Sequence, residues 1–534
     1  MTFKFWRGGD PFIWLTGSAL AFCLLMITGL VGIILYNGIG VFWPSDLRQF
    51  VLRNGDIAMG KVIDRQAIPD REGQFRIQLK VGNRDAYGLD FRWIDEADIE
   101  RVERPTDAVV LERIEWGDAY GFIRQINEGD RVLATGADAG WTELQPLLEK
   151  AAERWEVIYA IEHDEMGQLN RQMEELRLEE RRLTMAQADA AALAALEEQN
   201  RALWVSYEEI SDRLNAVRVE NERAELVLHL AEGQERSVRV ADIVRTYRPN
   251  DLSLGGKIAV YADKGWEFIA GQPRESNTEG GIFPALFGTV MMVMLMSLAA
   301  VPFGILAALY LREYARQGLF VRLVRIAVNN LAGVPSIVFG MFGLGFFVYG
   351  VGGSIDRLFY AESLPTPTYG TGGILWASLT LALLTVPVVI VATEEALAAV
   401  PRELREGALG LGSTKFQMIW NVVLPSALPG VLTGVILATA RGAGEVAPLM
   451  ITGVVKLAPD LPLDAYWPFF HLERKFMHLG FHIYDVGFQS PNVEAARPMV
   501  YTTALLLLLI VLALNLTAIV VRNKLRRRYA TAAF

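Results

Sequence analysis

The sequence predicts an α-helical integral membrane bundle of six spans that carries a large insert outside the cytoplasm. Hydrophobic residues make up 52% of the 534 residues although 21% are charged, a mixture typical of membrane spans joined to a soluble part. Charge is also sorted along the chain, because residues 37–280 contain 47 Asp and Glu against 31 Lys and Arg. The patterning inside this acidic insert predicts a β-domain followed by a coiled-coil hairpin.

Six apolar segments reach the length of about 20 residues that crosses a bilayer as a helix. They cover roughly residues 11–36, 284–310, 326–350, 373–393, 427–452 and 499–521. Short cytoplasmic loops are rich in Lys and Arg. The basic residues beside these segments are Lys4, Arg7, Arg312, Arg316, Arg322, Arg325, Arg402, Arg405, Lys415, Arg522, Lys524 and Arg526 to Arg528.

If successive spans cross the membrane in opposite directions, all these basic clusters fall on one side of it. We therefore expect both termini in the cytoplasm and residues 37–280, 351–372 and 453–498 outside it. The first apolar run is about 24 residues long and no Ala-x-Ala site follows it, which favours an uncleaved anchor over a signal peptide. The charge rule does not decide this point, since cleavage would leave the other five orientations unchanged.

The first part of the insert, residues 46–135, has the patterning of strands. Phe75–Val81 alternates apolar and polar residues, and Ala108–Trp116 and Ala119–Ile126 are further candidate strands. Strand-like patterning returns after residue 235, for example in Ser237–Val240 and Lys257–Tyr261. The two β-rich halves therefore flank the middle of the insert.

Residues 142–230 have helical periodicity instead. Apolar residues recur every three or four positions from Trp155 to Leu183 and again from Leu193 to Asn221, which predicts a coiled coil. An antiparallel hairpin turning near residues 186–190 is the simplest layout, although no Gly or Pro marks the turn and one long helix remains an alternative. Asn200 and Asn221 in the seam are expected to fix the register.

The predicted domains follow from these patterns. They are a membrane anchor (1–36), the first β-rich half (37–141), the coiled coil (142–230), the second β-rich half with a linker (231–280), and a five-helix membrane core (281–525) containing a cytoplasmic loop (394–425). The insert fits either a docking or sensing arm, whose partner is unknown, or a structural spacer.

Composition excludes several other classes of function. The net charge of −10 argues against nucleic acid as a partner. Cys23 is the only cysteine and lies in an apolar segment, so no intrachain disulfide can form. The five histidines show no compact metal-ligand spacing, and we expect no metal, cofactor or catalytic residue in this chain.

A motif in the loop between the fourth and fifth apolar segments carries the functional prediction. Its positions are Glu406, Gly407, Ala408, Gly412, Val422, Leu424 and Pro425. The pattern resembles the cytoplasmic coupling loop of ABC import permeases, with the consensus Glu-Ala-Ala-x3-Gly-x9-Ile-x-Leu-Pro. The resemblance implies two short helices that are joined at the glycine and dock into an ATP-binding subunit. We expect Leu424-Pro425 to end the second helix and restart the chain into the fifth span.

Two further stretches narrow the resemblance. Residues 330–340 read Asn-Leu-Ala-Gly-Val-Pro-Ser-Ile-Val-Phe-Gly, and residues 440–449 read Ala-Arg-Gly-Ala-Gly-Glu-Val-Ala-Pro-Leu. With the coupling loop they resemble the A-type permease subunit of phosphate-specific ABC transporters over roughly residues 275–525. The chain departs from that family at Gly407, where Ala is usual, and in the loop of about 240 residues after the first span, which is usually short.

The resemblance implies a type I importer permease in the bacterial inner membrane. The implied partners are a second, homologous permease subunit, two copies of an ATP-binding subunit and a periplasmic phosphate-binding protein. ATP would be bound and hydrolysed by the ATP-binding subunit, and this chain would be a transporter subunit without an enzymatic activity of its own.

Arg441 and Glu445 are the predicted residues of the substrate pathway. A charge near the bilayer centre costs on the order of 2.5–3.5 kcal/mol on insertion scales, so such residues usually face a pore or a partner. The two are four residues apart and are expected to share one helix face. A guanidinium suits an oxyanion such as phosphate, and Glu445 would hold Arg441 or accept a proton. A self-satisfied structural ion pair is the alternative.

The 330–340 stretch is expected to break a helix inside the membrane. Pro335 removes a backbone donor and Gly333 permits close helix packing. Such breaks either expose backbone groups to an anion or act as packing kinks. Asn330 and Ser336 beside the break are further candidates for the pathway, although interhelical hydrogen bonding explains the asparagine equally well.

Two alternatives to phosphate import remain at this stage. The chain could import another oxyanion, such as sulfate or molybdate. It could also be a membrane-anchored envelope receptor or scaffold in which the 37–280 insert is the working part. The coupling motif argues against the receptor, because a plain anchor needs no site for an ATPase.

Overall fold

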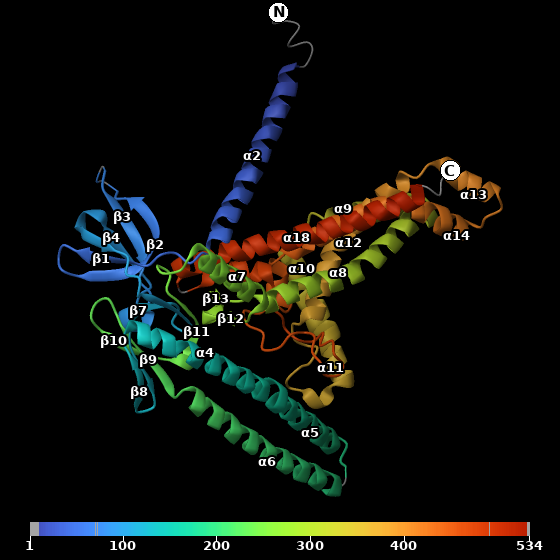
Figure 1. The fold of residues 1–534 in the computed structure, drawn as a ribbon. Coiled ribbons are helices and arrows are strands. Elements are labelled where there is room, and N and C mark those ends of the chain that lie inside the picture. Colours follow the sequence, from blue (N-terminus) through green and yellow to red (C-terminus); the bar gives the residue numbers. More distant parts are fainter. Residues whose placement is uncertain (1–9, 70, 72, 189, 491, 531–534) are drawn as a thin grey trace, which may run out of the picture.

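The computed structural model describes residues 10–69, 71, 73–188, 190–490 and 492–530, so the predicted basic residues Lys4 and Arg7 lie outside it. A helical bundle and a separate β-rich insert carrying a long helical hairpin make up the molecule (Figure 1). Six helices among the described residues are long and apolar enough to cross a membrane, which confirms the predicted fold class. They are Phe12–Gly40, Phe283–Tyr314, Ser336–Phe359, Ile374–Ala398, Lys415–Gly444 and Val493–Lys524.

The packed centre of the bundle is α12 (Ile374–Ala398), which lies against α8 (Phe283–Leu309) and α15 (Leu424–Gly444). Helix α18 (Val493–Ala530) packs on α15, whereas α2 (Asp10–Gly40) projects from the bundle in Figure 1. α2 meets α18 near Gly38, where the backbone carbonyl accepts a hydrogen bond from Thr502 Oγ1 at 3.5 Å. Most of α2 is therefore exposed apolar surface.

The third apolar segment differs from the predicted continuous span 326–350. Helix α9 (Leu319–Leu331) ends before the Gly-Val-Pro sequence, and α10 (Ser336–Phe342) begins after it. From there the helix continues through the π-helical segment η6 (Gly343–Gly352) and α11 (Gly353–Phe359). Pro335 has no N–H to continue the helical hydrogen bonds, so the predicted break is present, but it precedes the apolar helix Ser336–Phe359 instead of interrupting a span.

The fifth span also differs from its predicted limits, 427–452. Its helix runs without a break from Lys415 to Gly444 and stops at Glu445, and the short helix α16 (Ala447–Thr452) follows. Pro448 has no N–H for the carbonyl of Gly444, and Gly442 and Gly444 weaken the helix just before it, so the sequence favours a break here, although Pro429 is accommodated inside α15.

The prediction that Leu424-Pro425 ends a helix is wrong. Helix α14 (Lys415–Met418) continues through the π-helical turn η8 (Ile419–Val423) directly into α15. Pro425 lies in the first turn of α15, where a missing N–H is tolerated. The π-turn changes the hydrogen-bond register just before it.

The insert contains two antiparallel sheets. One has the strand order β4-β3-β2-β1-β5, and the other has the order β10-β9-β7-β6-β11 with β8 beside β7. The strands of the first sheet are β1 (Arg48–Leu52), β2 (Ile57–Ala67), β3 (Phe75–Lys80), β4 (Phe91–Asp95) and β5 (Ile99–Glu103). Those of the second are β6 (Val109–Arg113), β7 (Ala119–Glu128), β8 (Arg131–Thr135), β9 (Ala224–His229), β10 (Glu235–Arg239) and β11 (Ile243–Tyr247).

An antiparallel helical hairpin rises from the second sheet. Its first arm contains α4 (Ala137–Ala160), the π-helical segment η2 (Ile161–Met166) and α5 (Gly167–Met185), and its second arm is α6 (Ala190–Asn221). The arms lie side by side in Figure 1 and are joined by ion pairs such as Arg154–Glu220 at 3.2 Å. One continuous long helix, the alternative prediction, is therefore wrong.

The domain limits predicted for the insert need two corrections. The helical part covers 137–221 rather than 142–230, because β9 pairs with β7 and β10 in the second sheet. The predicted strand at Lys257–Tyr261 lies inside helix α7 (Leu254–Ala270). Ser253 caps this helix by accepting a hydrogen bond from the Gly256 N–H at 3.2 Å, so the helix signal at its start outweighs a short alternation.

Charged side chains are buried where the two sheets meet α7 and the small hairpin of β12 (Pro273–Arg274) and β13 (Glu279–Gly280). Asp118 forms ion pairs with Lys61 at 3.2 Å and Lys80 at 3.0 Å. Burial raises the pKa of Glu279 to about 7, although Lys80 acts in the opposite direction. This carboxyl lies four residues before α8, at the connection from the insert to the bundle.

Candidate functional site

The coupling segment consists of two short helices joined at Gly412. Helix α13 (Arg402–Gly410) ends two residues before this glycine, which has a φ of +87° and so allows the left-handed turn. Thr414 then caps α14, accepting from the Gln417 N–H at 3.3 Å while its own N–H donates to Gln417 Oε1 at 2.9 Å. These two reciprocal hydrogen bonds form a capping box. Together with the turn at Gly412 it starts a new helix, which continues into the fifth span.

Arg405 attaches α13 to the end of α12. Its guanidinium donates to the carbonyl oxygens of Leu397 at 2.7 Å and Val400 at 2.6 Å, and it pairs with Glu313 at 3.0 Å. The Arg405 and Glu313 side chains are only 18% and 10% exposed. The coupling segment is thereby fixed to the ends of two spans, α12 and the helix that starts at Phe283.

One side of the coupling segment is buried and the other presents apolar side chains to solvent. Met418, Ile419 and Val423 pack with Leu309 and Leu397 in a buried cluster. The exposed apolar residues on the other side are Leu404, Leu409, Leu411, Phe416 and Trp420. Leu411 is 90% exposed beside Gly412, so none of the residues that the structure describes covers this surface.

The predicted motif residues divide between these two sides. Glu406 and Gly407 are exposed, Ala408 and Leu424 pack against the buried cluster, and Val422 and Pro425 are half-buried. A methyl group on Gly407 would meet no atom within 4 Å, so this position tolerates the alanine of the family consensus.

Arg441 and Glu445 lie at the break that ends α15. Arg441 Nε is 3.5 Å from Glu445 Oε1, and the two side chains are 38% and 20% exposed. Glu445 follows the last helical residue and has an extended backbone, so the expectation that both share one helix face is wrong although their side chains meet. The partial exposure leaves the guanidinium accessible to a further partner.

The contacts of Gly442 show where the Arg441–Glu445 pair lies along the helical bundle. A Cβ on Gly442 would come within 2.4 Å of Met296 Sδ, so the two helices touch here. Met296 lies near the middle of the apolar helix Phe283–Tyr314, and the charged pair is therefore near the middle of the bundle.

The second helix break packs against the first. Gly340 in α10 approaches Pro448 in α16 so closely that a Cβ would lie 2.8 Å from the proline Cα. Ser336, half-buried, is the first residue of α10. Asn330 is exposed in the last turn of α9, and no hydrogen bond or ion pair among the described residues joins Asn330 or Ser336 to Arg441 or Glu445. The structure thus pairs only two of the four predicted pathway residues directly.

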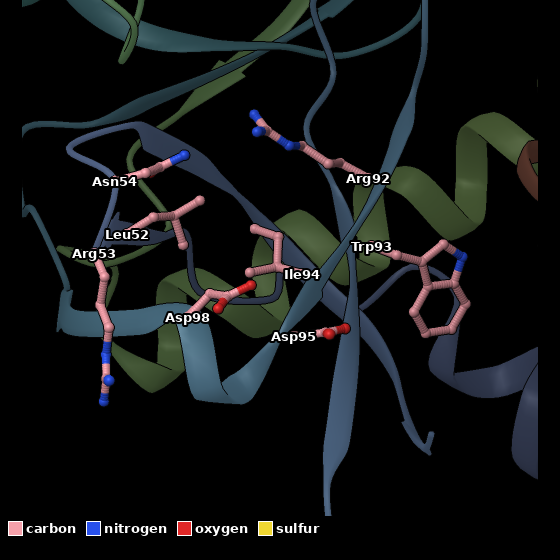
Figure 2. Close-up of a pocket in the computed structure, with 8 residues that line it drawn as sticks. All are labelled: Leu52, Arg53, Asn54, Arg92, Trp93, Ile94, Asp95 and Asp98. Carbon is pink, nitrogen blue, oxygen red and sulfur yellow. The ribbon is translucent and has the colours of Figure 1, made fainter. Parts of the chain in front are cut away.

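A cleft of about 530 Å³ lies in the insert, far along the chain from this pair (Figure 2). Arg92 and Trp93 extend to opposite sides of β4, as alternate strand residues do, and Asp95 and Asp98 also line the cleft. Arg53 and Arg92 balance these two carboxylates, so the lining has no excess of positive charge that would favour phosphate.

Sequence reasoning did not identify the anchor formed by Arg405 and Glu313. The residues are 92 positions apart, which hides the pairing from any local pattern. One signal was present: Glu313 is the single acid in the strongly basic stretch 311–325. A lone acid among several arginines is a candidate for an ion pair.

Comparisons with known proteins agree with the membrane core. The sequence profile of the binding-protein-dependent transport system inner membrane component matches residues 300–531. The phosphate transport system permease protein PstA 1 of Mycobacterium tuberculosis (strain CDC 1551 / Oshkosh) is 34% identical over 250 residues, which are 47% of this chain and 73% of that protein.

Two further relatives give similar values. The probable phosphate transport system permease protein PstA of Methanocaldococcus jannaschii is 32% identical over 48% of this chain and 80% of its own length. PstA of Yersinia pestis is 32% identical over 47% of this chain and 76% of its own. Among solved structures, a chain of the MetNI methionine ABC transporter in an inward-facing conformation aligns at 18% identity and a TM-score of 0.32, covering 45% of this chain and 94% of that chain.

The resemblance noted from the motifs at 330–340, 406–425 and 440–449 therefore points to the same family as these relatives, which match along most of their own length. The chain belongs to the family of PstA-type permease proteins of phosphate ABC transporters.

Proposed function

We propose that this chain is a permease subunit of an ATP-driven importer for inorganic phosphate. One observation carries the proposal beyond family membership: the helix Lys415–Gly444 has the coupling segment at one end and Arg441 at the other. At 1.5 Å per residue, the 26 residues between Lys415 and Arg441 correspond to roughly 39 Å of helix. A displacement at the coupling segment would therefore reach Arg441 through a single element.

The exposed apolar surface of the coupling segment is the proposed docking site for an ATP-binding subunit. Leu411 and Phe416 are large, solvent-exposed and close to the glycine turn, as expected of a surface that a partner covers. ATP binding and hydrolysis in two copies of that subunit would move α13 and α14. The Arg405–Glu313 anchor would transmit this movement to α12 and α8.

Arg441 is the proposed phosphate-binding cation. Its guanidinium is paired with Glu445 at 3.5 Å, a long contact that a phosphate oxygen could replace or share. Glu445 would repel a dianion, so it orients the arginine or accepts a proton from monobasic phosphate. Asn330 and Ser336 flank the other helix break and are proposed to line the same passage.

The proposed assembly includes a second, homologous permease subunit and a soluble phosphate-binding protein on the outer side. Both termini are placed in the cytoplasm and residues 37–280 outside it. Support for this orientation comes from the exposed arginines Arg312, Arg316 and Arg322, which lie on the same side as the coupling segment.

Uptake of radiolabelled phosphate tests the proposal. The chain is co-expressed with its partner subunits in cells that lack other phosphate importers, and unlabelled phosphate, sulfate or molybdate is added as competitor. Competition by phosphate alone is the expected result. Competition by sulfate or molybdate would replace phosphate with another oxyanion. Absence of uptake in an assembled complex would contradict the transport function and favour an envelope receptor.

A matched pair of variants tests the docking surface. Leu411→Asp is expected to prevent co-purification of the ATP-binding subunit, because it places a charge in the apolar contact. Glu222→Ala in the insert changes an exposed residue away from the coupling segment and is expected to leave co-purification unchanged. Equal recovery of the subunit with both variants would contradict the docking surface.

A further inference from the structure

The helical hairpin of the insert lies against the side of the bundle opposite the coupling segment. Helix α5 contacts the turn η7 (Ala361–Ser363), which belongs to the connection between α11 and α12. The guanidinium of Arg171 in α5 is 3.3 Å from the ring centroid of Tyr466, in the connection between α16 and α18. Figure 1 shows α5 passing beside α11. One arm of the hairpin therefore touches both connections.

Both connections are attached to the start of α12. The N–H of Ile374 donates to the carbonyl of Arg474 at 2.9 Å, and the N–H of Leu375 donates to that of Leu472 at 3.0 Å. Trp376 Nε1 donates to the carbonyl of Tyr369 at 2.7 Å. The surface under α5 thus moves with this end of α12, whereas the opposite end of α12 holds the coupling segment through Arg405.

The base of the hairpin is attached to a different span. Leu144 and Leu147 of α4 are buried in the core of the second sheet. The first sheet is joined to the start of α18, since Gln78 Nε2 donates to Glu494 Oε2 at 2.7 Å. The adjoining connection donates to the insert as well, from Asn492 Nδ2 to Asp90 Oδ2 at 2.7 Å. The two sheets are joined by the ion pair of Lys61 in β2 with Asp118 beside β7, so a movement of α12 relative to α18 would act on the contact of α5.

The contact at Arg171 combines an attraction with an unmet hydrogen-bond donor. A guanidinium over a tyrosine ring is stabilising. Arg171 Nη2, however, is buried without a hydrogen-bond partner among the described residues, and an unpaired buried donor costs free energy of the same order. Water would satisfy this nitrogen if α5 lifted. The two terms offset each other, so the contact is suited to breaking and re-forming.

We propose that the hairpin is a strap across the outer connections of the permease core that detaches from them in each transport cycle, with Arg171 as a positioning residue. The inference rests on the proposed function, since it assigns the strap to the outward side of a phosphate permease. Alternating access requires the outer ends of spans to separate, and α5 rests on connections that are attached to α12 while the insert at its base is attached to α18.

Reversible cross-linking tests the strap. Cys23→Ser removes the native thiol, and Arg171→Cys with Tyr466→Cys supplies a pair for a bifunctional methanethiosulfonate reagent that a reductant removes. Glu162→Cys with Arg218→Cys is the matched control, because these ion-pair partners join the two arms of the hairpin and not the core. Phosphate uptake is measured before cross-linking, after it and after reduction.

Loss of uptake in the Arg171–Tyr466 pair, restored by reductant and absent from the control pair, is the expected result. Undiminished uptake after complete cross-linking would overturn the strap, as would equal loss in the control. Failure to cross-link, although each cysteine reacts with a monofunctional reagent, would refute the contact itself. Absence of uptake by the Cys23→Ser parent, which keeps Arg171 and Tyr466, would instead contradict the proposed function, so the two failures are distinguishable.

Discussion

Arg405→Ala is predicted to disconnect the coupling segment while leaving the membrane core folded. The substitution removes two hydrogen bonds to the end of α12, from Arg405 to Leu397 O at 2.7 Å and to Val400 O at 2.6 Å. It also leaves Glu313, whose side chain is 10% exposed, without its partner. The buried carboxylate is the larger part of the cost, because Arg405 is its only ion-pair partner among the described residues.

The magnitude follows from the burial of this pair. Removing one partner of a buried ion pair costs about 3–5 kcal/mol, and the residual exposure of both side chains favours the lower end, about 3 kcal/mol. Since 1.4 kcal/mol is a factor of about 10 in an equilibrium constant, the detached state of α13 gains roughly 100-fold in population. A segment that is detached more often transmits less of each ATPase cycle to α12.

The assay compares phosphate uptake and ATP hydrolysis by the assembled complex in proteoliposomes. Arg405→Ala is expected to lower uptake far more than hydrolysis. Arg402→Ala, an exposed arginine at the start of the same helix, is the matched control and is expected to keep both. Adding Glu313→Ala to Arg405→Ala should recover part of the loss, because the second change removes the unpaired carboxylate.

Equal uptake by Arg405→Ala and Arg402→Ala would refute the anchor. A double variant no better than Arg405→Ala alone would also contradict the reasoning, since it would show that the unpaired charge of Glu313 is not the source of the defect.

Three further predictions concern glycines and a buried acid. Gly412→Ala, at φ +87°, should cost about 1 kcal/mol of backbone strain and lower the melting temperature of the complex. The control Gly407→Ala lies in a helix with open space around it and should leave the melting temperature unchanged. Equal melting temperatures for the two variants would contradict a left-handed turn at Gly412. Gly340→Ala must displace Pro448, at a cost of roughly 1–3 kcal/mol, and should impair phosphate uptake. The control Gly345→Ala meets no atom within 4 Å and should leave uptake unchanged. Greater loss of uptake in Gly345→Ala than in Gly340→Ala would contradict the packing of the two breaks. Glu279 has a pKa raised to about 7, so the folded state binds more protons than the unfolded state between pH 4.5 and 7. Its contribution to stability therefore falls as pH rises through this window, and Glu279→Gln should flatten the dependence of melting temperature on pH between 5 and 7.5; an unchanged dependence would contradict the burial of this carboxyl.

Features with a local cause could be predicted from the sequence. Long apolar runs identify the six spans because each helix must satisfy its own backbone in lipid. Gly412 and Pro335 act on the backbone directly, so the turn and the break were both predicted at the right positions. The alternation in Phe75–Val81 likewise predicts β3.

Features that depend on distant contacts could not be predicted. The helix continues through Pro425 by way of the π-helical turn η8, and no sequence pattern predicts that turn. Lys257–Tyr261 alternates like a strand but packs as part of α7. The pairing of Arg405 with Glu313 and the contact of Arg171 with Tyr466 join residues that only the tertiary structure brings together.

Phosphate uptake by variants of Arg441 tests the central claim most directly. Arg441→Ala removes the cation at the helix break, and Arg441→Lys keeps a charge without the guanidinium fork. Arg312→Ala removes an exposed positive charge near the coupling segment as a control. The account predicts that assembled Arg441→Ala complexes lose uptake, that Arg441→Lys retains part of it and that Arg312→Ala retains it. Uptake by Arg441→Ala at the rate of the unmodified complex would contradict the assignment of the phosphate pathway.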